Sequence, residues 1–406
     1  MKNWKRWLAL LLSLALAVSL CACKPGEQAD GGEQTDGSEQ PYGGITFDPT
    51  GGTANPDASP DPDASPDPDA RPSIEVDLTQ DLVSFAAGLS GGDILLTVNG
   101  EDIPADLFLY WLFWDCYYEY SYYYYYYGYT VDTMAGALLE DAVTVALYRT
   151  VLRQKAAELG CLPTDAQMQE ARDLLMSNGQ KYYDDMKASF GLSDEGMNYI
   201  ATYSYYYENL LDTIPVPTEE KLREYLDDKG MFYVKHILLM TVDGSYAPLP
   251  DDEAAEKKAQ AEDLLAQLQA AEDMPAKFDE LMKAYSEDGG LAANPDGYVF
   301  SDSDSLVGGF REAALELEEG QLSGIVETDY GYHIMLRLAF TDEMKETYRT
   351  ELRQGELDSL MDQWVETVEV TRAPALDALD VAAFFDRCTA YQSALYDQQA
   401  GGDAVG

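Results

Sequence analysis

Residues 326–334 of this chain are Val-Glu-Thr-Asp-Tyr-Gly-Tyr-His-Ile. They belong to a region, residues 325–338, in which two strand-like segments follow one another. The second segment contains His333, one of only 2 histidines in the 406 residues. The other, His236, lies in a strand-like run at 232–239. A single histidine in a strand is usually a structural residue, so the meaning of this pair depends on the surrounding sequence.

The predicted elements around the two histidines follow the order strand, two helices, strand, helix and two strands. Apolar residues at helical spacing predict the second helix, where Phe278, Leu281, Met282 and Tyr285 fall at i, i+3, i+4 and i+7. This order over residues 231–339 predicts a small α+β domain. The other predicted elements are a helix at 252–271, a strand at 298–300, and a helix with Phe310, Ala313, Ala314 and Leu317 on one face.

Four segments of this domain resemble the parvulin-type peptidyl-prolyl isomerases. The resemblance covers about residues 231–339, and its weight comes from all four segments occurring in the order of that family. It implies a four-stranded sheet with helices. The matching segments are Val234-Lys235-His236-Ile237-Leu238, Phe278 through Tyr285-Ser286-Glu287-Asp288, Gly309-Phe310 followed by Gly320-Gln321-Leu322-Ser323, and Val326 through Ile334.

The resemblance implies roles for six residues. His236 and His333 match the paired central histidines of the family. Asp288 matches an acidic position that would tune the histidine tautomers, and Thr328 matches a threonine that hydrogen-bonds within the histidine network. The residues that match the apolar pocket for the proline ring are Leu306 and Phe310.

The sequence also departs from the parvulin pattern near this site. Asn294-Pro295-Asp296-Gly297 stands where the family has Gly-Gly-x-Leu-Gly, Val307 where glutamine is common, and Tyr330 where a smaller residue is usual. These departures bear on catalytic rate more than on the fold. The loop after the first strand is acidic, with Val242-Asp243-Gly244 and Asp251-Asp252-Glu253, so a phosphorylated substrate is not expected.

The implied reaction explains why no metal or cofactor is expected. Rotation about an X-Pro amide faces a barrier of about 20 kcal/mol, but no bond is broken. An apolar slot that fixes the proline ring and a polar network that favours the twisted amide over the planar one are sufficient. The remaining Cys116, Cys161 and Cys388 are too widely spaced for a zinc site.

The N-terminus predicts export and lipid anchoring. Residues 1–22 contain Lys2, Lys5 and Arg6 followed by an apolar run that is too short for a membrane span, which is typical of a signal peptide. Leu20-Cys21-Ala22-Cys23 resembles a bacterial lipobox, with Cys23 as the acylated residue; the alternative is a simple cleaved signal. We therefore expect the protein at the extracytoplasmic face of the cell membrane. The acidic, proline-rich residues 23–91 predict a disordered tether.

The segments on either side of the parvulin-like domain resemble PrsA-like foldase lipoproteins and SurA-like chaperones. Val98-Asn99-Gly100 opens a helical region at 92–230, with a first helix expected from Asp102 to Tyr118. A C-terminal helix within 340–386 is expected to pack on that region, which makes the parvulin-like domain an insertion in a mostly helical chaperone-like domain. Residues 387–406 are expected to form a tail. The tyrosine run near residues 117–129 is either a client-binding surface or a helix extension without function.

The charge and the flanks limit the possible functions. The formal net charge is −48, which argues against nucleic acid as a partner. The leading hypothesis is a prolyl isomerase with a holding module for unfolded or partly folded exported polypeptides that contain X-Pro bonds. The first alternative is a catalytically inactive parvulin-fold chaperone. The second is a surface lipoprotein that captures solutes or adheres to a host.

Overall fold

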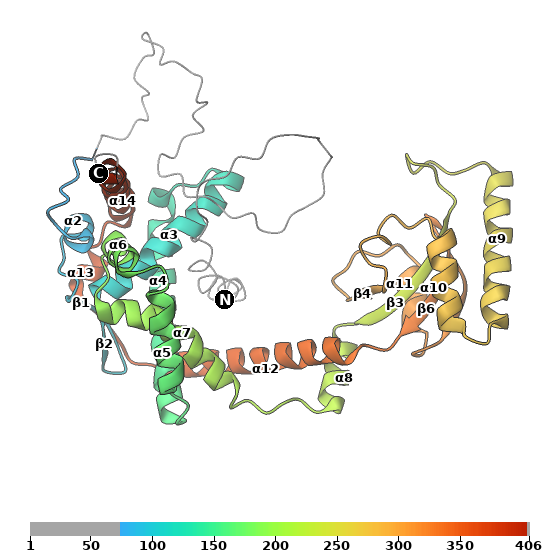
Figure 1. Ribbon diagram of the computed structural model, residues 1–406, viewed down its shortest axis with the longest axis horizontal. Helices are drawn as coiled ribbons and strands as arrows, with labels where there is room; N and C mark the ends of the chain where they lie inside the picture. The colour runs from blue at the N-terminus through green and yellow to red at the C-terminus, as the bar shows by residue number, and fades with distance from the viewer. Residues whose placement is uncertain (1–73, 404–406) are drawn as a thin grey trace, which may run out of the picture. The chain divides into compact units, whose positions relative to one another are not determined.

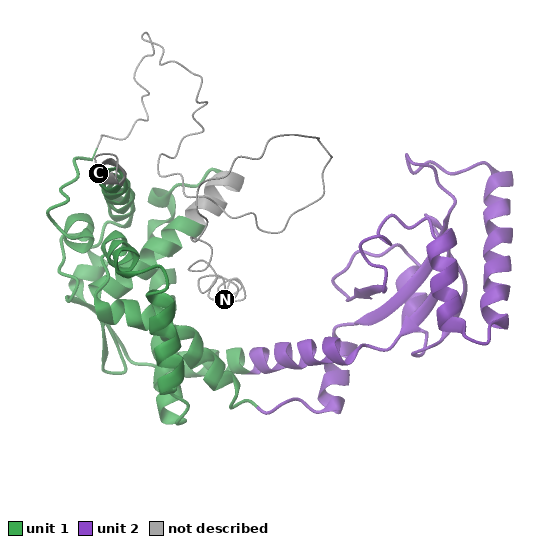
Figure 2. Cartoon of the chain, viewed as in Figure 1, with its two compact units in different colours: residues 1–214, 357–406 green, residues 215–356 purple. Residues whose placement is uncertain are grey.

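The computed structural model describes residues 74–403, which form two compact units (Figures 1 and 2). Unit 1 takes its described residues from Met1–Ile214 and Leu357–Gly406, and unit 2 is Pro215–Glu356. The signal peptide, Cys23 and most of the predicted tether lie outside the described residues. Within residues 74–403, no helix combines the length and the apolar character that crossing a membrane requires.

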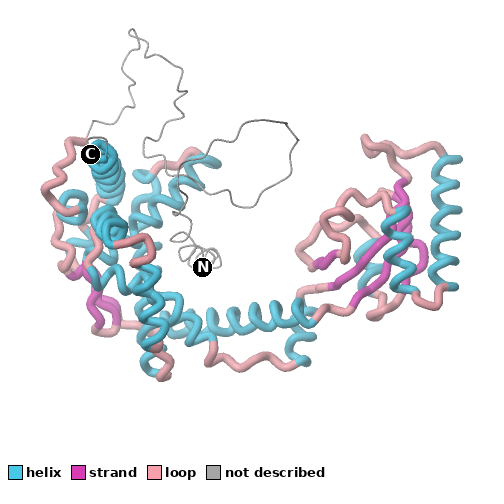
Figure 3. Tube along the Cα trace, in the orientation of Figure 1, coloured by secondary structure: helices cyan, strands magenta, loops and turns pink. Residues whose placement is uncertain are grey.

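Unit 1 is mostly helical and contains one small sheet (Figure 3). In this sheet the strand order is β2-β1-β7, and both pairings are antiparallel. The elements of unit 1 are α2 (Leu82–Ala87), β1 (Ile94–Val98), β2 (Glu101–Pro104), α3 (Ala105–Tyr127), α4 (Val131–Glu158), α5 (Asp165–Leu175), α6 (Gln180–Phe190), α7 (Asp194–Leu211), β7 (Val370–Arg372), α13 (Pro374–Asp377) and α14 (Val381–Asp403). Helix α12 (Asp342–Val365) contributes residues to both units.

Local sequence signals fix several of these helix ends. The Thr164 hydroxyl accepts from the backbone N–H of Gln167, and the Gln167 side chain accepts in turn from the N–H of Thr164, so that α5 begins with a capping box. Ser193 caps α7, and its own backbone N–H donates to the buried carboxylate of Asp106 over 2.8 Å. These contacts satisfy backbone donors that would otherwise be left without partners at the helix starts.

The core of unit 1 is built from both ends of the chain. Val98 in β1 pairs with Val370 in β7, which brings the C-terminal segment against the N-terminal helices. Side chains from the two segments then share one apolar cluster. Fully buried members of this cluster from the N-terminal segment are Leu95, Leu96, Phe108, Leu112, Leu138 and Met197; buried members from the C-terminal segment are Leu357, Met361, Leu376, Phe384 and Cys388.

The structure corrects two predicted ends of the folded part. Ordered elements were expected from residue 92, but Leu82, Val83 and Ala86 of α2 are buried in the core of unit 1. The predicted tail from 387 is instead part of α14, where Cys388 and Tyr391 are buried. Both segments are short or polar in composition, and their few apolar residues are buried only because another segment of the chain covers them.

The predicted borders of the inserted domain also shift. We expected the border after 230, yet Leu222 and Leu226 of α8 (Glu219–Asp228) pack with Tyr233 and Phe340 of unit 2.

The helix expected from Asp102 begins later, at the start of α3, because residues 101–104 pair with β1 as a strand.

Unit 2 confirms the predicted α+β class with a four-stranded sheet. The strand order is β4-β3-β6-β5, and all three pairings are antiparallel. Helices α9 and α10 contribute to one apolar cluster and α11 to another. The elements are α8, β3 (Phe232–Met240), α9 (Asp251–Ala270), α10 (Met274–Tyr285), β4 (Tyr298–Phe300), α11 (Phe310–Leu315), β5 (Leu322–Thr328) and β6 (Gly331–Leu338).

The alternation of side chains along the central strands decides where the histidines lie. Ile237 and Ile334 pack with α9 and α10, whereas Val234 and Met335 pack with Phe310 of α11. Residues two apart on a strand share a face, so the even positions of β3 and the odd positions of β6 face α11. His236 is paired with Met335, which makes His333 its diagonal neighbour on that same face.

Candidate functional site

Four predicted polar residues meet on the α11 side of the sheet. His236 Nδ1 and His333 Nδ1 are 3.2 Å apart, and both side chains are buried. Asp288, in the loop after α10, places its Oδ2 3.3 Å from His236 Nε2. At the other end, Thr328 Oγ1 lies 2.9 Å from His333 Nε2. The four side chains therefore form one continuous line of polar contacts, supplied by three strands and a loop.

The pKa values of Asp288 and His333 determine which groups in this line are charged. Hydrogen bonding with His236, supported by Tyr298 and the Gly290 N–H, holds the pKa of the Asp288 carboxyl well below its usual range, although burial opposes this. Burial, reinforced by the neighbouring His236, lowers the pKa of His333 to about 3. At neutral pH the line therefore begins with a carboxylate and contains a neutral His333.

An ionised carboxylate can only accept hydrogen bonds, so Nε2 of His236 must carry a proton. When His236 is neutral, its Nδ1 is an acceptor and His333 must donate from Nδ1. Nε2 of His333 then accepts from the Thr328 hydroxyl. The Thr328 oxygen in turn accepts from the backbone N–H of Tyr330 over 3.2 Å. The ionised Asp288 thus selects one tautomer at each histidine.

The apolar side of the site is made by Phe310 and its neighbours. The Phe310 ring stands edge-on to both imidazoles, with centroid distances of 5.2 Å to His236 and 5.2 Å to His333. Phe310 is buried, whereas Leu306 and Val307 are only partly buried against the same cluster. The structure therefore brings all six residues of the predicted parvulin site to one face of the sheet.

Tyr298 was predicted only as a strand residue, but it lies in the site. Its hydroxyl donates to Asp288 Oδ2, and its ring centroid is 5.5 Å from that of His236. Nothing in the sequence around β4 indicates this contact, because it depends on the antiparallel pairing of Tyr298 with Val234.

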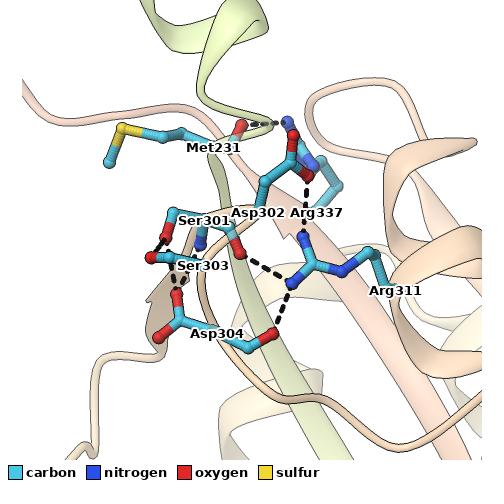
Figure 4. A network of polar contacts seen from close by, with 7 residues as sticks. All are labelled: Met231, Ser301, Asp302, Ser303, Asp304, Arg311 and Arg337. Atoms are coloured by element: carbon cyan, nitrogen blue, oxygen red, sulfur yellow. Dashed lines mark hydrogen bonds and ion pairs between the residues drawn. The ribbon is translucent and has the colours of Figure 1, made fainter.

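Arg311 was also missed by the sequence analysis, and it organises the loop between β4 and α11 (Figure 4). Its guanidinium donates to the carbonyls of Ser301 over 2.6 Å and Asp304 over 2.7 Å, and pairs with the Asp302 carboxylate at 3.1 Å. Figure 4 also shows Arg337 donating to the carbonyl of Met231. The loop held by Arg311 carries Leu306, which packs against the cluster that contains Phe310.

We expect Arg311→Met to loosen residues 301–309 and to lower kcat/KM for an X-Pro peptide about tenfold, since several charge-assisted hydrogen bonds are lost. Hydrogen exchange of the loop amides should rise in parallel. Arg349→Met is the matched control, because Arg349 pairs with Glu219 in the same unit at 2.5 Å but contacts no residue of the site. Equal kcat/KM in the two variants would contradict a role of Arg311 in the pocket.

The described part of the chain offers no group of three or more His, Cys, Asp or Glu side chains with the geometry of a metal site. The polar line through the histidines ends at the Thr328 hydroxyl, which contacts His333, and at the Asp288 carboxylate, which contacts His236 and Tyr298.

The segment that contains these residues is similar to known proteins. Residues 236–339 match the family model "Rotamase: PPIC-type PPIASE domain". The chain is 33% identical over 147 residues to the foldase protein PrsA of Geobacillus kaustophilus, covering 35% of this chain and 45% of the relative. It is 32% identical over 142 residues to the chaperone SurA of Pseudomonas fluorescens, covering 34% and 31%. The chain thus matches less than half the length of either relative.

Among solved structures, the peptidyl-prolyl isomerase PrsA of Bacillus cereus is similar with a TM-score of 0.30 and 19% sequence identity, covering 74% of this chain and 99% of that chain.

Proposed function

We propose, from the parvulin-type peptidyl-prolyl isomerase domain that residues 236–339 form, that this protein is an extracytoplasmic foldase. It would isomerise X-Pro bonds and bind unfolded or partly folded exported polypeptides. The observation that carries the proposal is the polar line from Asp288 to Thr328, which lies against Phe310 within the segment that matches the family.

The geometry suits rotation about an amide rather than bond cleavage. Phe310 and Leu306 would hold the proline ring, and the histidine line would meet the amide as it twists out of plane. The polar side chains bond to one another: the hydroxyl of Thr328 contacts His333 Nε2, and Asp288 contacts His236 and Tyr298. Catalysis then comes from binding the twisted amide better than the planar one.

The test of the enzymatic part is the exchange rate of an X-Pro peptide, measured by NMR with the purified chain. We expect acceleration over the spontaneous reaction, and a loss of about tenfold or more in kcat/KM for His236→Ala and for Asp288→Ala. Lys235→Ala is a matched control, because this neighbour of His236 pairs with Asp279. A wild-type rate equal to the spontaneous rate would instead support the inactive parvulin-fold chaperone.

The holding part of the proposal assigns clients to unit 1. It is supported by the similarity to a foldase and to a chaperone, and by the mostly helical unit 1, which combines N-terminal and C-terminal segments of the chain. A chain in which unit 2, Pro215–Glu356, is replaced by a short Gly-Ser linker should still suppress the aggregation of an unfolded client. Loss of this suppression, with unit 1 still folded, would assign client binding to unit 2.

We also propose a lipid anchor at Cys23, which would hold the protein at the extracytoplasmic face of the cell membrane. The support is the basic, apolar and lipobox-like order of residues 1–23. Cys23→Ser should release the protein from the membrane fraction and leave the signal peptide uncleaved. Cys21→Ser is the control and should leave the protein in the membrane fraction; the reverse pattern would overturn the assignment of Cys23.

A further inference from the structure

One oxygen of Asp288 receives two side-chain donors. Oδ2 lies 3.3 Å from His236 Nε2 and 2.5 Å from the hydroxyl of Tyr298. The other oxygen, Oδ1, accepts the backbone N–H of Gly290 over 3.1 Å. Tyr298 is therefore the only side chain besides His236 that is shown to bond to this carboxylate among the described residues.

From this geometry we infer that Tyr298 is a positioning residue for prolyl isomerisation, which keeps Asp288 as an ionised acceptor and so fixes the tautomers of His236 and His333. The inference rests on the proposed function and adds a residue that acts through Asp288 without touching the substrate.

The direction of the hydrogen bond supports this role. Burial and the Asp288 carboxylate raise the pKa of Tyr298 above its usual range, so the phenol keeps its proton and donates it. A carboxylate that receives donors at both oxygens is stabilised in its charged form. Asp288 then has no proton to give to His236 Nε2, and with His236 neutral the donors in the line run from Thr328 toward Asp288.

The ring of Tyr298 is held independently of its hydroxyl. It stacks on Phe300 with centroids 5.6 Å apart and an interplanar angle of 14°. Gly290 leaves room for the phenol, since a Cβ at that position would lie 2.6 Å from the Tyr298 oxygen. Tyr298→Phe should therefore remove the bonds of the hydroxyl to Asp288 and Asn294 and leave the ring in place.

Three titratable side chains act on Asp288. His236 on β3 and Tyr298 on β4 bond to it directly, and His333 on β6 interacts with it electrostatically. The adjacent Glu287 pairs with Lys257 of α9 and accepts the Met240 N–H over 2.7 Å. The protonation state of Asp288 is therefore coupled to the two histidines and Tyr298, and not to Glu287.

The kinetic test compares Tyr298→Phe with the wild type at neutral pH. We expect about a tenfold lower kcat with KM within about twofold, because Asp288 loses a charge-assisted bond that positions it. In an Asp288→Asn background, Tyr298→Phe should cost little more, since the two residues act as a unit. Losses that simply add in the double variant would overturn the inference.

The matched control is Tyr233→Phe. Tyr233 lies on β3 of the same sheet, is buried, and donates to the carbonyl of Asp296 over 2.6 Å. Removing its hydroxyl tests the general cost of losing one buried tyrosine bond. An equal loss of kcat in the control would show that the effect is structural and would overturn the inference.

A second readout does not depend on catalysis. The chain has 2 histidines, so the ¹⁵N signals of their rings can be followed in the full chain. Tyr298→Phe should change the ¹⁵N shifts that report which ring nitrogens of His236 and His333 carry protons, whereas Tyr233→Phe should not. Unchanged ring signals would overturn the inference even in an active enzyme. An inactive wild type with the expected ring signals would overturn the proposed function alone.

Discussion

Phe310→Ala should lower kcat/KM for an X-Pro peptide by about 100-fold, the largest loss that we expect from any single substitution in the site. Phe310 stands edge-on to both histidines at 5.2 Å and forms the apolar side of the site. Burying an apolar side chain contributes about 1.5–3 kcal/mol, and about 2.7 kcal/mol corresponds to 100-fold in rate. NMR exchange with a proline peptide measures the loss directly.

The same substitution also destabilises unit 2, because Phe310 is only 4% exposed and loss of a buried Phe costs about 3–5 kcal/mol. Phe310→Leu separates the two effects, since it keeps much of the apolar volume and removes the ring edge. Phe278→Leu is its control, because Phe278 is fully buried in the cluster with α9 and α10. If Phe310→Leu were as active as Phe278→Leu at equal stability, the aromatic ring would have no catalytic part.

Deleting residues 379–406 should unfold unit 1. Helix α14 buries Ala382 and five larger apolar side chains in the core of this unit. At about 1.5–3 kcal/mol for each of the five, their loss reaches the whole stability of a typical domain, about 5–15 kcal/mol. The five are Val381, Phe384, Phe385, Cys388 and Tyr391. Amide hydrogen exchange should show loss of protection in α3 and α4, while the amides of unit 2 remain protected.

Tyr396→Ala is the control for this deletion, because Tyr396 is on the same helix but 64% exposed. It should leave exchange in α3 and α4 unchanged. Full protection of these helices in the truncated chain would show that the N-terminal segment folds without its C-terminal partner, against the shared core described above.

Patterns that depend on neighbours in sequence were predictable. The period of Phe278, Leu281 and Met282 predicted α10, and the strand-like runs around His236 and His333 predicted the two central strands. The antiparallel register of these strands brings the two histidines together. Asp288 comes shortly after the end of α10 in the sequence, and this helix end places it beside His236. The resemblance to the parvulins named these residues in advance, and their catalytic roles remain predictions.

Contacts between distant segments were not predictable from local pattern. Helix α2 has 6 residues, and its buried Leu82 and Val83 gain a core only from segments far along the chain. Tyr298 reaches Asp288 because β4 pairs with β3, and Arg311 closes a loop whose carbonyls carry no sequence signal. Each of these depends on tertiary pairing, which outweighs local propensity.

The shared core of unit 1 has a consequence for the order in which the protein is made. A chain grows from its N-terminus at about 5–20 residues per second, and a domain can complete its folding only when its last contributing segment has emerged. Unit 2 is one continuous stretch, Pro215–Glu356, and can close its core as soon as that stretch is complete. Unit 1 still needs β7 and α14 at that time. The helices that are synthesised first therefore have to wait for the end of the chain before their apolar faces are covered.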